Sequence, residues 1–294
     1  MAKPAEKPHK PFFSKDLFKD IVFVVVAFLF LNSFVVASFV VPTGSMENEI
    51  MAGDFLFVNK FLYGGTTPRV IPFVDVRLPW FRLPAFRSVQ RGDVIVFEYP
   101  GDRDEVHPAA FQFYLKRCVA LSGDTIQVVN RVLYVNGKPF PLPRHLQFDR
   151  TQGMPDDYVD SQIFPKGTPY NQDFWGPEVV PSAGESILLS AENLEKWRTF
   201  IAREGHAAQL RRDGTVLIDG VPATSYQVRR NYMFGMGDHR DNSMDSRFWG
   251  YIPEENIVGT PMIVYWSWDP DIPIYNLFPK LASIRLGRIG SIVK

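Results

Sequence analysis

Ser45 is the first residue of this sequence that invites a chemical interpretation. It lies in Val-Val-Pro-Thr-Gly-Ser-Met-Glu-Asn-Glu, residues 40–49, directly after a long apolar stretch. A serine hydroxyl acts as a nucleophile only when a base takes its proton and donors hold the developing oxyanion. Gly44 permits a tight turn that aims the Ser45 N–H at a substrate, and the Thr43 hydroxyl offers a second donor. Ser45 belongs to neither the G-x-S-x-G nor the S-x-x-K motif.

The base for Ser45 must come from elsewhere in the chain, as a histidine or a lysine. Lys116 lies in an apolar strand, residues 111–124, where burial lowers a lysine pKa from about 10.4 by as much as several units. Strand alternation turns Lys116 to one face and Arg117 to the other. The alternative is that Lys116 is a surface lysine whose ammonium group reaches solvent, which would give the same sequence pattern. The five histidines are His9, His107, His145, His206 and His239.

A third polar segment lies near the C-terminus, at residues 235–250. It holds four Asp or Asn residues, one histidine, two serines and two arginines between hydrophobic strands. Such a composition favours a hydrogen-bond network that supports a functional site. A plain turn with an Asp–Arg pair would have a similar composition.

An apolar segment positions the serine relative to a membrane. Residues 21–41 include only three polar side chains, and 21 helical residues span a hydrocarbon layer of roughly 30 Å. Five lysines precede it within residues 1–20, which predicts a cytoplasmic basic N-terminus. We therefore expect a transmembrane helix over 21–41, with the rest of the chain exported and Ser45 at the membrane surface.

The remainder of the chain is expected to be mainly β. Short β-branched and aromatic runs at 54–63, 93–99, 124–130, 131–140 and 215–223 are bounded by turn residues. One helix is predicted at 190–205, capped by Ser190 and ended by Gly205. We expect a catalytic β domain from 42–140 and 233–294, with an inserted α+β subdomain at 141–232. The basic tail from Ile272 either lies against anionic lipid headgroups or is simply solvated.

Taken together, these segments resemble the type I signal peptidases, membrane-bound Ser/Lys proteases that cut signal peptides from exported proteins. Residues 42–54 are similar to the nucleophile box of that family and 91–100 to its following strand. Residues 113–124 resemble its lysine box and 237–253 its closing Gly-Asp…Asp-Ser-Arg box. The resemblance covers roughly 20–140 and 231–294.

The resemblance implies roles for individual residues. Ser45 would be the nucleophile and Lys116 the general base, with the Ser45 N–H and Thr43 hydroxyl as the oxyanion hole. Ser243 would orient the Lys116 amine, Asp245 and Arg247 would form a supporting ion pair, and Asp238 would brace the loop. The shallow pockets for small side chains such as Ala would be lined by Phe39, Val41, Pro42, Met46, Tyr114 and Leu115.

Two positions depart from the family pattern. Asn48 replaces the usual proline of Ser-Met-x-Pro, and His239 stands where Asn is common. We expect both carboxylates, Asp238 and Asp245, to point away from the Lys116 amine, because a carboxylate in contact would raise its pKa.

The same resemblance implies partners and location. These are signal peptides of exported preproteins, membrane lipid and proximity to the secretion translocon, in a bacterial inner membrane with the catalytic domain periplasmic. An organelle membrane is the alternative. The balance of 32 basic and 32 acidic residues does not point to nucleic acid, and neither cofactor nor metal is expected.

Two other functions fit parts of the pattern. One is a membrane-anchored Ser/His/Asp hydrolase that uses His239. The other is a non-enzymatic, anchored β-rich binding module in which the three segments are only turns.

Overall fold

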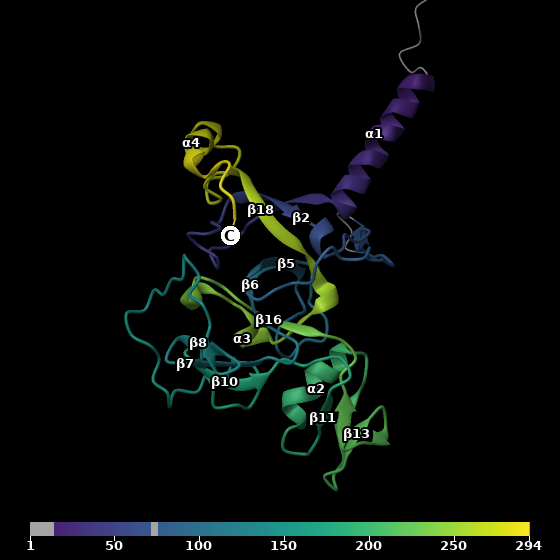
Figure 1. The fold of residues 1–294 in the computed structure, drawn as a ribbon, viewed down its shortest axis with the longest axis vertical. Helices are drawn as coiled ribbons and strands as arrows, with labels where there is room; N and C mark the ends of the chain where they lie inside the picture. The colour runs from purple at the N-terminus through teal and green to yellow at the C-terminus, as the bar shows by residue number, and fades with distance from the viewer. Residues whose placement is uncertain (1–14, 72–75, 294) are drawn as a thin grey trace, which may run out of the picture.

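One apolar helix projects from a β-rich body in the computed structural model, which describes residues 15–71 and 76–293 (Figure 1). The helix α1 (Lys15–Phe34) is long and apolar enough to cross a membrane, and Ser33 is its one buried residue. Residues 1–14, with most of the predicted basic N-terminus, lie outside the described residues. The predicted mainly β class with an N-terminal apolar helix is confirmed.

The boundaries of this helix differ from the predicted 21–41. The helix ends at Phe34, and β1 (Val36–Val40) pairs antiparallel with β2 (Asp54–Asn59). An apolar run does not by itself distinguish a helix from a strand. The backbone polar groups of β1 are satisfied by β2, so the chain leaves the helix earlier than its composition predicts.

A seven-stranded antiparallel sheet runs through the body, with its strands in the order β1-β2-β18-β5-β6-β16-β17. Its other members are β5 (Val94–Glu98), β6 (Phe113–Leu121), β16 (Tyr232–Met236), β17 (Ile252–Pro253) and β18 (Ile257–Ser267). Register shifts along β18 let it pair with β5 at its start and with β2 further on. β18 thereby joins the strand next to the helix to the strands that lie deeper in the body (Figure 1).

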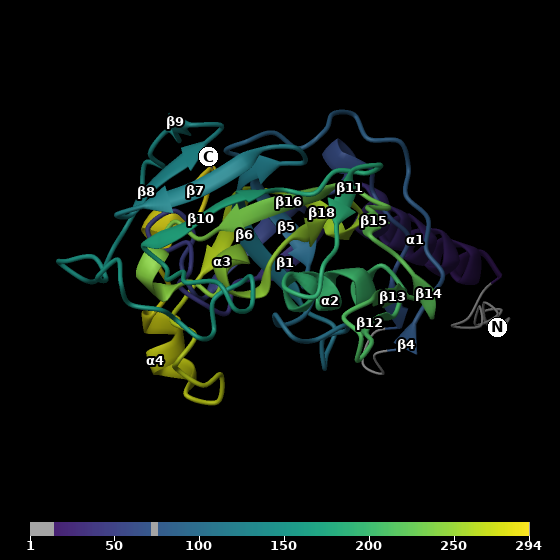
Figure 2. The ribbon, with the colours of Figure 1, turned by 90° about the horizontal axis from the view of Figure 1, so that it is seen from below.

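The segment 141–232 is joined to the preceding residues by a second sheet. This sheet has the order β10-β7-β8-β9 and consists of β7 (Thr125–Val129), β8 (Val132–Val135), β9 (Lys138–Pro139) and β10 (Phe174–Val179). Because β10 pairs with β7, the boundary expected at residue 140 falls inside a sheet (Figure 2). Ile163 and Trp175 from this segment also share one core with Ile95 and Phe234.

The remaining elements are short. The strand pairs are β3 (Val70–Ile71) with β4 (Val76–Arg77), β11 (Ser186–Leu188) with β15 (Ser225–Gln227), and β13 (Val216–Ile218) with both β12 (Ala208–Leu210) and β14 (Val221–Pro222). The helices are α2 (Leu194–Arg203), α3 (Ser246–Trp249) and α4 (Leu277–Ala282), with 3₁₀ turns η1 (Phe61–Tyr63), η2 (Arg240–Asn242), η3 (Glu254–Asn256) and η4 (Leu286–Arg288). The predicted helix at 190–205 corresponds to α2, which begins after Asn193.

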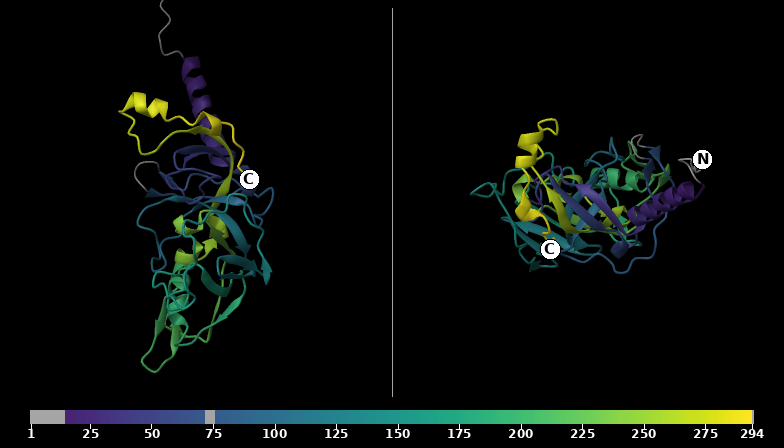
Figure 3. Two further views of the ribbon diagram at one scale, coloured as in Figure 1. Left: turned by 90° about the vertical axis from the view of Figure 1, so that its left-hand side faces the viewer. Right: turned by 90° about the horizontal axis from the view of Figure 1, so that it is seen from above.

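Different helices and strands lie at the two ends of the body. α4 lies at the same end as α1, whereas α2 and β12–β14 lie at the far end (Figure 3). A small core of Val41, Met46, Leu56, Val96 and Val258 lies beneath the turn after β1. This core fixes the turn that carries Ser45.

Candidate active site

Ser45 lies in a tight turn that is fastened on both sides. Within the turn, the N–H groups of Glu47 and Ile50 donate to Gly44 O and Met46 O. The Met46 side chain is buried in the small core, and the Ser45 carbonyl accepts from the His239 N–H at 3.1 Å. Among the described residues the Ser45 N–H has no acceptor. It is therefore available to an incoming ligand.

The Lys116 amine is in direct contact with Ser45. Its Nζ donates to Ser45 Oγ at 2.6 Å, and both side chains are buried. Lys116 is brought there by β6, where it lies opposite Ile95 of β5. Burial lowers the pKa of Lys116 to about 8, while Asp245 raises it and Arg247 lowers it. The pKa of the Lys116 amine is thus close to the value that a general base requires near neutral pH.

The two expected carboxylates are engaged with arginines. Asp238 binds Arg117 through two donors, with Nη2 2.6 Å from Oδ2 and Nε 2.9 Å from Oδ1. Asp245 forms a similar pair with Arg247, at 2.8 and 2.9 Å, and also accepts from the Gly237 N–H. Although burial opposes its charge, Arg247 keeps the pKa of Asp245 below its ordinary value. Neither carboxylate forms a hydrogen bond to the Lys116 amine in the structure.

Ser243 reaches the site without the expected bond. Its Oγ is buried and has no hydrogen-bond partner among the described residues, so the predicted bond to the Lys116 amine is not formed. The Lys116 amine is instead directed at Ser45. Ser243 and Ser45 line the same cavity.

Two glycines that sequence analysis did not assign make room for this arrangement. A Cβ on Gly237 would lie 2.3 Å from Ser243 Oγ and 2.6 Å from Ser45 O. A Cβ on Gly235 would lie 3.2 Å from Lys116 Cβ. The Gly-Met-Gly spacing in the third polar segment was the available signal.

A cavity of about 740 Å³ opens onto Ser45 and Lys116. This volume is within the range of ordinary ligand sites. All six side chains expected in the substrate pocket line it, as does Thr43, whereas the supporting residues Asp238, Asp245 and Arg247 lie behind its wall. Val41 and Leu115 belong to the apolar side of the cavity. Within the described residues, no group of three or more His, Cys, Asp or Glu side chains could hold a metal.

The sequence matches the family model described as "Signal peptidase, peptidase S26" over residues 14–266. The chain belongs to this family. It is 29% identical to signal peptidase I of Rickettsia typhi over 94% of this chain and 92% of that protein. It is 31% identical to signal peptidase I of Pseudomonas aeruginosa, over 88% and 74% respectively, and 30% identical to that of Rickettsia massiliae, over 94% and 92%. Membership makes the chain a peptidase, and it supports removal of signal peptides as its activity.

His239, one of the departures from the family pattern, is engaged away from the serine hydroxyl. Its Nδ1 is 3.2 Å from Glu47 Oε2 and its Nε2 is 2.8 Å from Asp149 Oδ1. The imidazole is buried between these two carboxylates, while the backbone of His239 holds the Ser45 carbonyl. The geometry therefore supports Lys116 over His239 as the base.

Asn48, the other departure, is explained by backbone conformation. Its φ is +71°, which Asn tolerates and Pro cannot adopt. The Asn48 side chain donates to Gln147 Oε1 at 2.5 Å. This hydrogen bond ties the turn that carries Ser45 to the segment 145–150.

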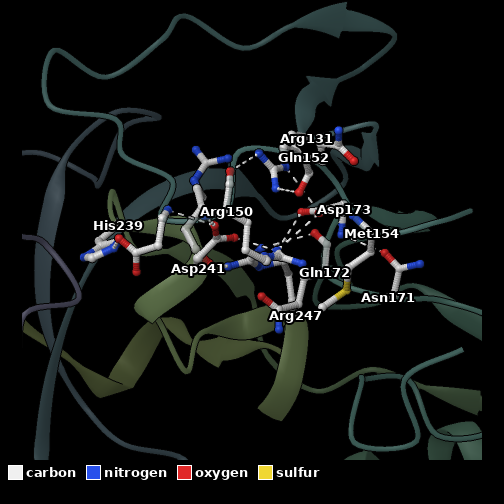
Figure 4. A network of polar contacts seen from close by, with 12 residues as sticks. Arg131, Arg150, Gln152, Met154, Asn171, Gln172, Asp173, His239, Asp241 and Arg247 are labelled. Atoms are coloured by element: carbon white, nitrogen blue, oxygen red, sulfur yellow. Dashed lines mark hydrogen bonds and ion pairs between the residues drawn. The ribbon is translucent and has the colours of Figure 1, made fainter. Parts of the chain in front are cut away.

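A polar network holds residues 145–150 against the third polar segment (Figure 4). Asp241 accepts from the N–H groups of Asp149 and Arg150 at 2.9 Å and pairs with the Arg150 guanidinium at 2.5 Å. Arg150 also pairs with the buried Asp173, which Arg131 approaches from the other side. The segment expected to be an insertion therefore helps to build the catalytic face.

Proposed function

We propose that this chain removes signal peptides as a serine endopeptidase, with Ser45 as nucleophile and Lys116 as general base. The observation that carries the proposal is the buried 2.6 Å contact between the Lys116 amine and the Ser45 hydroxyl, two side chains that both line the cavity. Strongly perturbed pKa values cluster at functional sites, and Lys116 combines a lowered pKa with direct contact to a serine hydroxyl in a cavity.

In the first half of the reaction, neutral Lys116 takes the Ser45 proton as Oγ attacks the carbonyl carbon of the scissile bond. The oxyanion is held by the Ser45 N–H and the Thr43 hydroxyl. The resulting Lys116 ammonium then protonates the leaving amine as the C–N bond breaks. The signal peptide remains as an ester on Ser45.

In the second half, neutral Lys116 takes a proton from a water molecule as the water oxygen attacks the ester carbon. Lys116 then returns that proton to Ser45 Oγ as the ester C–O bond breaks, and the signal peptide leaves with a free carboxyl group. Ser243, whose hydroxyl is unpaired and nearby, would hold the amine in position while Ser45 is acylated. The ion pair of Asp245 with Arg247 keeps a net negative charge away from the amine, and that of Asp238 with Arg117 braces the loop that holds Ser45.

The pocket supports cleavage after small residues, of the Ala-x-Ala type. Its walls at Val41 and Leu115 are apolar, and Phe39, Pro42, Met46 and Tyr114 complete the lining. Bulky side chains would be excluded by contact with these walls. Efficient cutting after Leu or Phe would argue against this specificity.

The site of action we propose is a bacterial inner membrane, with α1 as a single-pass anchor and the body on the periplasmic face. Membrane lipid and the vicinity of the secretion translocon are then the surroundings of the enzyme. Exposed apolar side chains at the end of the body nearest α1, among them Tyr275 and Phe278, are suited to lipid.

The test is cleavage of an exported preprotein by the full-length protein in detergent. We expect one cut after a small residue, lost in Ser45→Ala and in Lys116→Ala but retained in His239→Ala. Loss of cutting in His239→Ala with retention in Lys116→Ala would favour the Ser/His/Asp alternative. No cutting by any of these proteins would favour a binding module.

A further inference from the structure

The cavity at Ser45 has two chemically different halves. One half is apolar and comes from β1 and β6, with Phe39, Val40 and Phe113. The other half is polar and includes Asp160, Gln162 and Gln172 from the segment between β9 and β10, together with Asn242 of η2. Ser45 lies between them, because it follows β1 and a Cβ on its neighbour Gly44 would be 3.6 Å from Asn242 Nδ2.

The polar half is a fixed wall that projects free hydrogen-bonding groups. Its loop is anchored by Ile163 and Phe164, which are buried in the main core, and by Arg247, which donates to Gln172 O at 3.2 Å. Asp160 Oδ1 accepts from the Gln162 N–H at 2.9 Å, which leaves Oδ2 for a ligand. Among the described residues, the carboxylate of Asp160 has no cationic partner, and the side-chain amides of Gln162 and Gln172 form no hydrogen bond.

The direction of the substrate follows from the position of the anchor. β1 continues from α1, so the apolar half lies along the chain that leaves the membrane. The segment between β9 and β10 belongs to the part of the body on the side away from α1 (Figures 1 and 3). A leader peptide held in the membrane would reach Ser45 from the apolar side and continue beyond the scissile bond toward the polar wall.

We propose that this polar wall binds the first residues of the mature protein, after the scissile bond, and favours basic or amide side chains there over acidic ones. This inference rests on the proposed function and adds a specificity site on the far side of the cut. Asp160 supplies the charge that discriminates, and the two glutamines supply neutral donors and acceptors. A carboxylate in the substrate would face Asp160 without a compensating cation on this wall.

The experiment uses the full-length protein in detergent and peptide substrates with a constant Ala-x-Ala site. Lys, Gln or Glu is placed singly at each of the first four positions after the cut. We expect kcat/KM for Lys to exceed that for Glu at one position by about two- to fivefold, the size of a partly exposed charge contact. Asp160→Asn, which retains the acceptor for the Gln162 N–H, should remove the difference, and Asp160→Lys should reverse it.

Asp157→Lys is the matched control, because Asp157 is exposed on the same loop and does not line the cavity. It should keep the wild-type ratio of Lys to Glu substrates. Equal ratios in wild type and Asp160→Lys at all four positions would overturn the inference while leaving the proposed function intact. Absence of any cleavage that depends on Ser45 would overturn the proposed function and this inference with it.

Discussion

At the level of single residues, the site depends on keeping a lysine neutral beside a serine. Burial of Lys116 disfavours its ammonium form, and the nearby Asp245 opposes that effect while Arg247 supports it. The carboxylate and the guanidinium of this pair therefore act on the Lys116 pKa in opposite directions. This balance makes the pKa of Lys116 sensitive to either partner.

Asp245→Asn tests this balance. Removing the carboxylate removes the influence that raises the Lys116 pKa, so the ascending limb of kcat/KM against pH should move below about 8. Leaving Arg247 buried without its carboxylate partner should also cost about 3–5 kcal/mol of stability, so the assay is made at low temperature on protein shown to be folded. A limb that stays in place or moves to higher pH would contradict the assigned electrostatics.

Gly237→Ala tests the packing of the site. The new Cβ would collide with Ser243 Oγ and with Ser45 O, at 2.3 and 2.6 Å. Because displacement of reacting groups by about 1 Å costs on the order of 100-fold in rate, kcat/KM should fall by about that factor. Gly287→Ala is the control, since its Cβ would meet nothing within 4 Å, and it should be fully active. Normal activity in Gly237→Ala would show that the two serines are not held by this contact.

At the level of elements, the turn after β1 is stiffened by residues far away in the sequence. Asn48 at φ +71° donates a hydrogen bond to Gln147. Across the same junction, the His239 imidazole is hydrogen-bonded to Glu47 and its Nε2 lies 2.8 Å from Asp149 Oδ1. Residues 145–150 are held in turn by Asp241. Part of the segment expected to be an inserted subdomain therefore contacts the turn that carries Ser45.

Asn48→Pro tests this arrangement and would restore the residue usual in the family. A proline fixes φ near −65°, so it should distort the turn and lower kcat/KM by at least tenfold. Asn48→Gly keeps access to positive φ and removes only the bond to Gln147, so its loss should be much smaller. If Asn48→Pro is as active as Asn48→Gly, the turn does not require the observed conformation.

The sequence was most informative where chemistry is local. Ser45, Lys116 and the third polar segment stood out as candidates by residue type, and the family resemblance supplied their expected roles. The strands within residues 124–140 could be predicted from their β-branched residues and turn residues. The end of α1 at Phe34 could not be predicted, because an apolar run such as Val36–Val40 is compatible with either a helix or a strand. The pairing of β10 with β7 and the contact of Asn48 with Gln147 join residues that are far apart in the sequence. Local patterns, such as alternating apolar and polar residues or turn residues, do not predict such contacts.

At the level of the whole molecule, the end of the body near α1 is more apolar than the basic tail suggested. Three of the four basic residues after Ile272 are used within the protein. Lys280 donates to Asp269 O, Arg285 to Ala52 O, and Arg288 pairs with Asp54. Tyr275 and Phe278 are more than 80% exposed beside them. Lipid contact here would be apolar and only weakly dependent on salt.

The orientation that we propose can be tested in intact cells. With α1 as a single anchor and the body outside, protease added to spheroplasts should degrade an epitope placed at the C-terminus. A cytoplasmic marker protein should remain intact in the same sample. Protection of the epitope until the membrane is dissolved would place the catalytic body on the inner face.

The central claim is that Lys116 is the base for Ser45, and its most direct test is the pH dependence of kcat/KM for cleavage of a preprotein. Since only the neutral amine can take the serine proton, kcat/KM should rise with pH through an apparent pKa of about 8 and then level off. Lys116→Arg should be inactive throughout, because a guanidinium keeps its proton in this range. A profile that is flat from about pH 6 to 10, or substantial activity in Lys116→Arg, would show that the base lies elsewhere.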